Sequence, residues 1–300
     1  MNKQFKTPIL YVVFNRLDVV KKTFPIIAKQ KPKQLFIAAD GPRNEEEKSK
    51  TDSVRKYILD NINWKCEVKT RLLDNNLGCR DGVSTAIDWF FENVKQGIIL
   101  EDDCVPNDSF FKFSEEMLNR YKTNKKVFSI SGYNYLEKLN IDDSYYFSKY
   151  FECLGWSSWR NKWFAQDKLL KDYVKDLKSG QLKKVIRNPI ERILLKKKFK
   201  DNFEGRIGAW DHSFSYLHFK NKGICVKPKV NLVENIGFME DSTHTRGNFI
   251  DNKFYCIKKF GLNFPLTHPK TVQINEYLSN KELRKNIIRI SLKKIFWFLL

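Results

Sequence analysis

The stretch Gly97-Ile98-Ile99-Leu100-Glu101-Asp102-Asp103 carries the clearest fold signal in this chain of 300 residues. Its apolar half is typical of a buried strand, and three carboxylates follow at once. Carboxylates that leave water need a compensating cation. Mg²⁺ or Mn²⁺ binds one or two carboxylates together with phosphate oxygens and water. The stretch therefore predicts a metal site that receives a phosphorylated ligand, with a solvated acidic turn as the simpler alternative.

Short apolar runs alternate with helical patterns around this stretch. Strands are predicted over residues 9–14, 35–39, 68–73 and 98–100, and helices over residues 17–28, 45–59 and 83–93. This βαβα rhythm is typical of a parallel sheet with crossover helices, whose ligands bind at the carboxyl ends of the strands. Arg16 and Asp40 stand at two such ends, and Arg80 opens the third helical pattern. A guanidinium there can bind a diphosphate or simply lie on the surface.

The second half of the chain is richer in aromatic and basic residues. Trp156 follows an aromatic stretch, residues 162–200 form a basic helical pattern, short strands are predicted around residues 223–237, and a basic helix ends the chain. Indole faces can pack on a sugar ring, although aromatic side chains at such spacing are more often core. Asp211 precedes another helical pattern and is a candidate general base or a helix cap.

The charge of the chain predicts a polyanionic partner. The 55 Lys and Arg against 35 Asp and Glu give a formal charge of +20, which attracts nucleic acid, an anionic bilayer or phosphorylated substrates. Six cysteines without a CxxC pair favour reduced thiols. No apolar leader precedes the first strand, and the apolar residues 287–300 are too few and too interrupted to span a bilayer. We therefore expect a cytoplasmic protein, with its tail on the membrane's inner face or packed on the domain.

Residues 97–113, "GIILEDDCVPNDSFFKF", resemble the DXD-type element of GT-A glycosyltransferases, most closely the N-acetylglucosaminyltransferase I family and its bacterial family-2-like relatives. Further segments resemble that family in the same order along the chain: Pro8 to Arg16, Ala39-Asp40, Leu154-Gly155-Trp156, Trp210-Asp211 and Ser242-Thr243-His244. Two features depart from the family pattern. Thr245 stands where the family has glycine, and the basic segment 162–200 has no counterpart.

The resemblance implies a Rossmann-like mixed sheet and a role for each matching residue. It makes Asp103 the Mn²⁺ or Mg²⁺ ligand and Asp211 the base of an anomer-inverting reaction. The donor site would include Arg16, Asp40, Glu101, Asp102 and His244, with Arg80 added from its position, and the acceptor site Trp156 and Trp210. The donor would be a nucleoside diphosphate sugar, and the acceptor a saccharide or lipid-linked saccharide of bacterial surface polysaccharide or lipopolysaccharide synthesis.

The predicted organisation is a GT-A domain over residues 1–270 and a basic amphipathic tail over residues 271–300. Within the domain, residues 1–132 would bind the nucleotide sugar and residues 133–270, with the insertion 162–200, the acceptor. Two other functions compete with sugar transfer. A nucleotidyltransferase also joins an α/β sheet to acidic metal ligands, but it normally has a glycine-rich, lysine-bearing loop that residues 14–18 lack. A nucleic-acid-binding protein fits the charge, but an acidic triplet repels a phosphate backbone.

Overall fold

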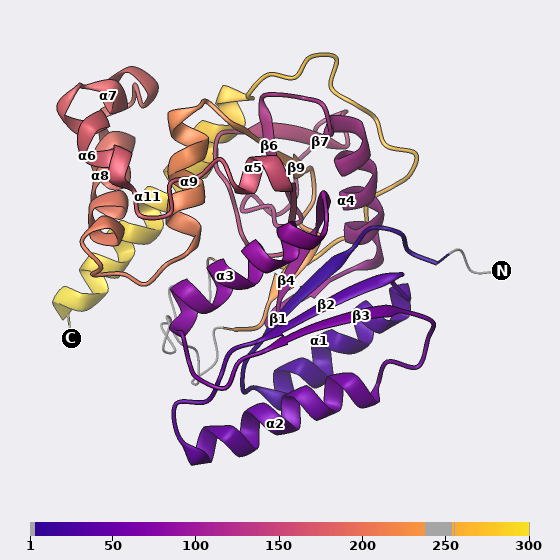
Figure 1. Cartoon of the computed structure of the whole chain (residues 1–300). Helices are drawn as coiled ribbons and strands as arrows, with labels where there is room; N and C mark the ends of the chain where they lie inside the picture. The colour runs from indigo at the N-terminus through magenta and orange to yellow at the C-terminus, as the bar shows by residue number, and fades with distance from the viewer. Residues whose placement is uncertain (1–3, 238–253, 255, 300) are drawn as a thin grey trace.

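An eight-stranded mixed sheet forms the centre of the protein (Figure 1). The computed structural model describes residues 4–237, 254 and 256–299, with side chains up to residue 293. The strand order is β3-β2-β1-β4-β8-β6-β9-β7. Helices cover both faces of the sheet, so the mixed α/β fold expected from the sequence is confirmed.

The first four strands are parallel, as predicted from the βαβα rhythm. Side chains alternate between the two faces of β1: Tyr11 packs on Phe24 of α1, with ring centroids 6.0 Å apart, whereas Leu10 lies in the cluster that contains Phe90 of α3. This double burial explains why β1, β2 and β4 have nearly continuous apolar sequences. The elements are β1 (Ile9–Val13), α1 (Leu17–Gln30), β2 (Gln34–Ala39), α2 (Glu45–Asp60), β3 (Glu67–Leu72), α3 (Gly78–Asn93) and β4 (Gln96–Glu101).

The second half of the chain completes the same sheet instead of forming a separate one. β8 pairs antiparallel with both β4 and β6, which joins the two halves through their backbones. A small second sheet pairs β5 with β10. The elements are β5 (Cys104–Pro106), α4 (Asp108–Tyr121), β6 (Val127–Ser131), β7 (Tyr145–Ser148), β8 (Trp156–Trp159), α9 (Asp211–Lys220), β9 (Ile224–Pro228) and β10 (Val233–Asn235).

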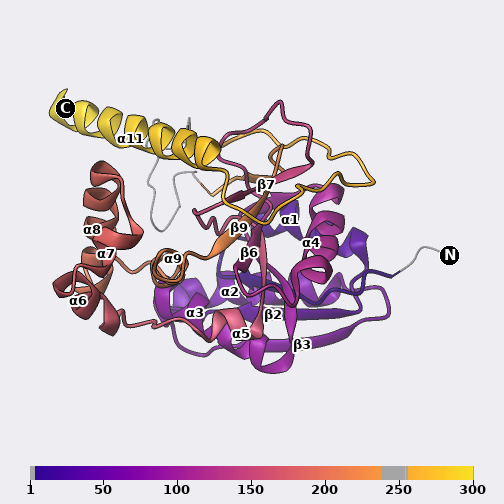
Figure 2. The same ribbon diagram turned by 90° about the horizontal axis from the view of Figure 1, so that it is seen from above.

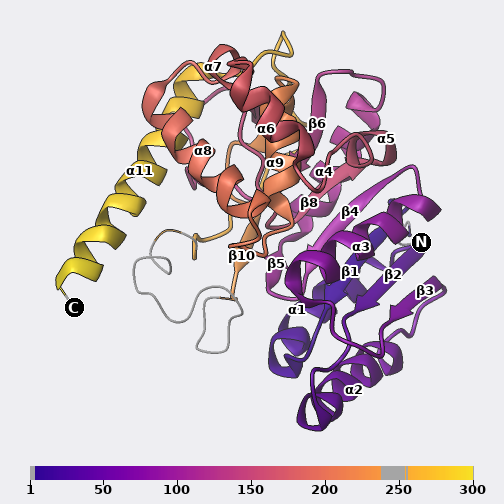
Figure 3. The same ribbon diagram turned by 60° about the vertical axis from the view of Figure 1, so that its left-hand side comes forward.

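The basic segment 162–200 is helical, as its composition predicted, and forms a lobe at one side of the sheet (Figure 3). Its own small core includes Leu170, Tyr173 and Phe199, which pack with Tyr216 of α9. The lobe comprises α6 (Lys171–Lys178), α7 (Gln181–Val185) and α8 (Pro189–Phe203), and the short α5 (Arg160–Trp163) leads into it from β8.

The last helix, α11 (Glu276–Leu299), is attached to the sheet by a buried carboxylate. Glu282 accepts hydrogen bonds from Lys227 at 2.7 Å, Tyr146 at 3.0 Å and Ser148 at 2.5 Å. Lys227 is fully buried, so this ion pair and its hydroxyl partners fix where α11 leaves the sheet. From that anchor the helix runs outward to the C-terminus (Figure 2). None of the described helices is long and apolar enough to cross a membrane.

Candidate active site

The acidic triplet and Arg16 meet at the carboxyl edge of the parallel strands. β1 and β4 are neighbours in register, with Val12 opposite Glu101, so the residues that follow the two strands emerge side by side. The Arg16 guanidinium forms ion pairs with Asp102 and, at 3.3 Å, with Oδ2 of Asp103. The site therefore already contains an internal cation for two of its three carboxylates.

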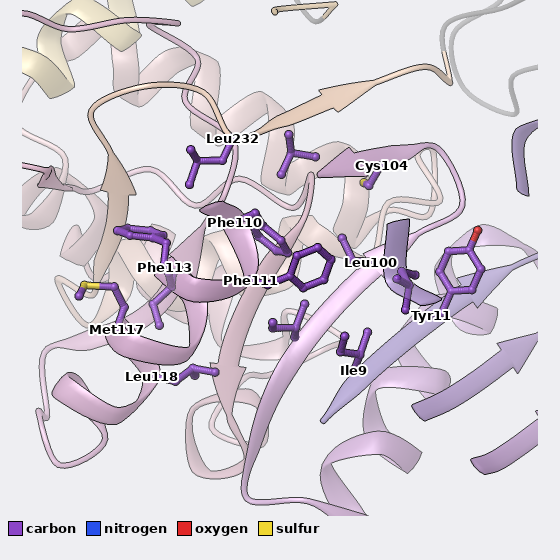
Figure 4. Close-up of a cluster of buried hydrophobic side chains, with 14 of the residues drawn as sticks. Ile9, Tyr11, Leu100, Cys104, Phe110, Phe111, Phe113, Met117, Leu118 and Leu232 are labelled. Atoms are coloured by element: carbon purple, nitrogen blue, oxygen red, sulfur yellow. The ribbon is translucent and has the colours of Figure 1, made fainter. Parts of the chain in front are cut away.

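Helix α4 packs beside the strands that lead to this edge, with Phe110 and Phe111 on the side of the helix that faces Leu100 (Figure 4). Asn107 begins the helix by accepting a hydrogen bond from the backbone N–H of Phe110 at 3.1 Å. Phe110 and Phe111 are fully buried in the cluster that also contains Leu100 and Cys104, the residues that bracket the triplet. Packing on both sides of the triplet leaves the carboxylates little freedom to move away from one another.

Burial and the neighbouring negative charges raise the pKa values of Glu101 and Asp102. Burial raises the pKa of Glu101, and the negative charges of Asp103, Asp102 and Asp211 raise it further. Burial also raises the pKa of Asp102, and the Arg16 guanidinium offsets only part of that rise. An added cation would favour the charged forms of both groups. The arrangement is thus suited to receiving more positive charge than Arg16 alone supplies.

Asp211 reaches the same place from a distant part of the sequence. It is the first residue of α9, and its charge contributes to the raised pKa of Glu101, so the two carboxylates interact. Trp210 fixes the start of the helix because its ring stacks on Trp156 at a centroid distance of 5.7 Å. Asp211 lies in the first turn but not at the N-cap position, which Trp210 occupies, so helix capping does not account for it.

Lys198 of α8 is a site residue that the sequence analysis missed. Its Nζ lies 3.4 Å from Oδ2 of Asp211. Burial acts to raise the pKa of Asp211, but the charges of Lys198 and His212 and the hydrogen bonds to the carboxylate together outweigh burial, and the net pKa is lowered. Asp211 is therefore ionised at neutral pH and able to accept a proton. Lys198 stands in a run of three lysines, and only the tertiary structure distinguishes it from Lys196 and Lys197.

Asp103 lies beside the strand that precedes the segment 238–253. Its backbone carbonyl accepts a hydrogen bond from Ile236 at 3.0 Å, and a Cβ on Gly237 would lie 2.1 Å from its Oδ2. A larger residue at position 237 would therefore displace the Asp103 carboxylate from this position. The side chain of Asp103 keeps 21% of its surface exposed, whereas Asp102 keeps 6%, so Asp103 is the carboxylate more open to a ligand.

The donor atoms suit a hard divalent cation whose coordination is completed by a ligand. Within the described part of the chain, no group of three or more His, Cys, Asp or Glu residues is arranged as a complete metal cage. Asp103 and Asp102 nevertheless offer oxygens side by side, and Mg²⁺ is commonly held by one or two carboxylates plus substrate phosphates and water. The residues therefore fit a metal that arrives with a phosphorylated ligand.

The carboxylate of Asp40 is hydrogen-bonded to the start of α3. Its Oδ1 accepts from the backbone N–H of Leu77 at 2.9 Å, and its Oδ2 accepts from Gly78 at 3.1 Å. This ties the end of β2 to α3, whose second residue, Cys79, lies by the carboxylates. Burial raises the pKa of the Cys79 thiol to about 12, with further contributions from Glu101 and Asp211. A nucleotide contact by Asp40 stays a prediction.

Arg80, the other predicted cation on this side, pairs with its neighbour Asp81 at 2.9 Å and is largely exposed. Its Cβ lies 3.9 Å from where a Cβ on Gly208 would stand, which places it near the loop before Trp210. It borders the site without contacting the acidic triplet. The predicted donor residue His244 lies outside the described residues.

The two predicted acceptor-binding tryptophans are core residues, which corrects the expectation of a sugar platform. Trp156 is 0% exposed and Trp210 is 5% exposed, and both pack with Trp163, while Trp156 also packs with Phe214 and Trp210 with Phe151. Their ring faces are covered by other rings and are not open to a sugar. The aromatic spacing reflected the core, and the contribution of Trp210 is to hold the start of α9 in place.

No family model and no curated protein matches this sequence. Solved structures with similar folds include a putative glucose-1-phosphate thymidylyltransferase from Bacillus anthracis (12% identity, TM-score 0.40, covering 85% of this chain and 97% of that one). Mouse xyloside xylosyltransferase 1 is similar at 10% identity and a TM-score of 0.40, over 88% of this chain and 100% of that one. The 4-diphosphocytidyl-2C-methyl-D-erythritol synthase of Anaerococcus prevotii is similar at 8% identity and a TM-score of 0.36, over 85% of this chain and 97% of that one. These TM-scores are too low for the matches to identify the activity of this protein.

Proposed function

We propose that this protein is a GT-A-type glycosyltransferase that transfers a sugar from a nucleoside diphosphate donor to a hydroxyl acceptor. One observation carries the proposal: Glu101, Asp102 and Asp103 at the end of β4 meet Asp211 at the start of α9, beside Arg16. Acidic residues with a neighbouring cation suit a metal-bound diphosphate, and a separate ionised carboxylate suits a base. The resemblance to the N-acetylglucosaminyltransferase I family likewise makes Asp103 the metal ligand and Asp211 the base, and it places Asp102 in the donor site, where we add a metal contact.

In this proposal, Asp103 and Asp102 hold Mn²⁺ or Mg²⁺ at the diphosphate. The metal, when bound, neutralises the charge that develops on the leaving phosphate. Arg16 is placed to donate charge-assisted hydrogen bonds to the same phosphates. Glu101 lies next to these groups and accepts hydrogen bonds from donor hydroxyl groups.

Asp211 takes the proton from the acceptor hydroxyl. As that oxygen forms a bond to the anomeric carbon, the bond from the carbon to the diphosphate oxygen breaks, and the diphosphate leaves with the electron pair. Because nucleophile and leaving group stand on opposite faces of the sugar, a single displacement inverts the anomeric centre. A positioned base contributes on the order of 10² to 10⁴ in rate. The acceptor we propose is a saccharide or lipid-linked saccharide of bacterial surface polysaccharide synthesis.

Calorimetry tests the donor site directly. We expect one class of nucleoside diphosphate and its sugar conjugates to bind in the presence of Mn²⁺ and not in the presence of chelator. Asp103→Ala should abolish that binding, whereas Asp108→Ala, an exposed carboxylate paired with Lys29 shortly after the triplet, should not. Failure of the whole panel to bind would overturn the proposal.

Product analysis tests the reaction. Asp211→Asn should keep donor binding and lose about 10² to 10⁴ in turnover, because the amide cannot accept the proton. The wild-type product should be a free nucleoside diphosphate. Release of pyrophosphate from a nucleoside triphosphate and a sugar phosphate would instead identify a nucleotidyltransferase.

A further inference from the structure

Helix α8 exposes isoleucines on the outer face of the basic lobe. Ile190 is 53% and Ile193 is 67% exposed. Lys197 and Lys200 continue the same exposed face at helical spacing, while Glu191 and Phe199 are buried on the opposite one. The sequence alone showed a basic helix, but which apolar side chains face water was decided by the packing of the lobe. Exposing two neighbouring isoleucines to water is unfavourable, so we expect a binding partner to cover this face.

Helix α11 repeats this pattern. Leu278 and Leu283 are buried beside the Glu282 anchor, whereas Ile288 is 54% and Leu292 is 40% exposed. Arg284 and Lys281 lie on the same exposed face, one and two turns before Ile288. Beyond the anchor, the helix therefore presents aliphatic side chains together with cations.

The two helices lie on the same side of the molecule (Figures 1 and 2). Exposed cations cluster there, and the nearby acids are already paired: Asp201 with Lys197 and Arg206, and Asp172 with Lys220. We define the α8/α11 surface by its exposed residues, which are Ile190, Ile193, Lys197 and Lys200 of α8, Lys281, Arg284, Ile288 and Leu292 of α11, and Lys183 and Lys184 of α7, the helix before α8.

We propose that the α8/α11 surface docks on an anionic lipid bilayer. Cations attract the anionic headgroups, and aliphatic side chains between the cations insert among the acyl chains, which is the composition of an interfacial helix. Nucleic acid would use the cations but not the isoleucines, because phosphates are bound by charge and hydrogen bonds. The exposed aliphatic residues therefore favour lipid. This inference is independent of the proposed sugar transfer.

Vesicle co-sedimentation with the full chain tests the proposal. We expect binding to vesicles of phosphatidylcholine with phosphatidylglycerol, little binding to phosphatidylcholine alone, and weaker binding at high salt. Ile190→Ser with Ile193→Ser should reduce binding on the order of 100-fold, since each buried aliphatic side chain contributes about 10-fold. Lys183→Glu with Lys184→Glu should reduce it as well, and only on anionic vesicles.

Matched controls come from the opposite side of the protein. Leu59→Ser with Leu72→Ser removes similarly exposed aliphatic side chains, at 43% and 37% exposure, and should leave binding unchanged. Lys22→Glu with Lys48→Glu, on α1 and α2, should also leave vesicle binding unchanged. The proposal is overturned if the serine variant binds vesicles like wild type. It is also overturned if the protein binds RNA through the same lysines and does not bind vesicles. A third contrary outcome is that the protein does not bind vesicles and size-exclusion chromatography shows a dimer that the isoleucines hold together.

Discussion

Arg16 and Asp102 form an ion pair across the neighbouring ends of β1 and β4, and the same guanidinium nitrogen lies 3.3 Å from Oδ2 of Asp103. The protein thus compensates its own acidic triplet before any ligand is present. A metal bound with a diphosphate would share these carboxylates with Arg16 and offer it phosphate oxygens as new acceptors. This relationship links the stability of the protein to the occupancy of its site.

Arg16→Gln should lower the free energy of unfolding by about 2–4 kcal/mol at neutral pH, because it leaves buried carboxylates without their cation. Urea unfolding measures this. Added Mn²⁺ should raise the urea midpoint of the variant more than that of wild type, because the ion replaces the missing charge. Arg80→Gln removes an exposed guanidinium and should change stability by no more than about 0.5 kcal/mol. Equal losses of unfolding free energy in both variants would show that the ion pair between Arg16 and the triplet contributes no more to stability than an exposed arginine does.

Lys198→Gln should move the acidic limb of the pH profile of kcat/KM to higher pH. Lys198 lowers the pKa of Asp211, so its removal raises that pKa, and a base with a higher pKa is protonated sooner as the pH falls. Steady-state kinetics across the acidic range measure the limb. Lys197→Gln, whose side chain pairs with Asp201 and not with Asp211, should leave the limb in place. A limb that does not move in the Lys198 variant would argue against Asp211 as the base.

Gly237→Ala should weaken metal-dependent nucleotide binding by 10-fold or more. The new Cβ would lie 2.1 Å from Oδ2 of Asp103, so the carboxylate has to move away from its position beside Asp102. Calorimetry with Mn²⁺ and the nucleoside diphosphate measures the loss. Gly261→Ala is the matched control, since a Cβ there meets nothing within 4 Å. Unchanged affinity in the Gly237 variant would indicate that Asp103 is not a ligand in this orientation.

His218→Gln should flatten the acid side of the stability profile. Burial lowers the pKa of His218 to about 3, so the unfolded chain takes up the proton first as the pH falls below about 6.5. Each pH unit below that point therefore costs wild type about 1.4 kcal/mol through this group. Urea unfolding at about pH 6 and about pH 5 should show a smaller difference for the variant, whatever its absolute stability. Identical pH dependence in the two proteins would refute a neutral, buried His218.

Local sequence patterns predicted the first half of the sheet well. The apolar runs at residues 9–14 and 35–39 correspond to β1 and β2 within a residue or two, because strands buried on both faces need apolar side chains at every position. The run at residues 68–73 corresponds to β3, an edge strand that is only partly buried. The family resemblance, not the aromatic spacing, placed Trp156 and Trp210 in the acceptor site, and both are core residues. An aromatic residue looks alike in sequence whether it lies under a sugar or under another ring, and here it lies under another ring.

The sequence by itself determined that strand β4 ends in three carboxylates and that the strand before them is buried, because composition and order are local properties. Only the tertiary structure decided which side chains lie beside those carboxylates. Parallel pairing of β1 with β4 brought Arg16 to Asp102. Packing of Trp210 on Trp156 placed Asp211 near Glu101, and docking of α8 on α9 selected Lys198 from a run of lysines. These contacts join residues far apart in the chain, and no local periodicity encodes which of them meet when the layers pack.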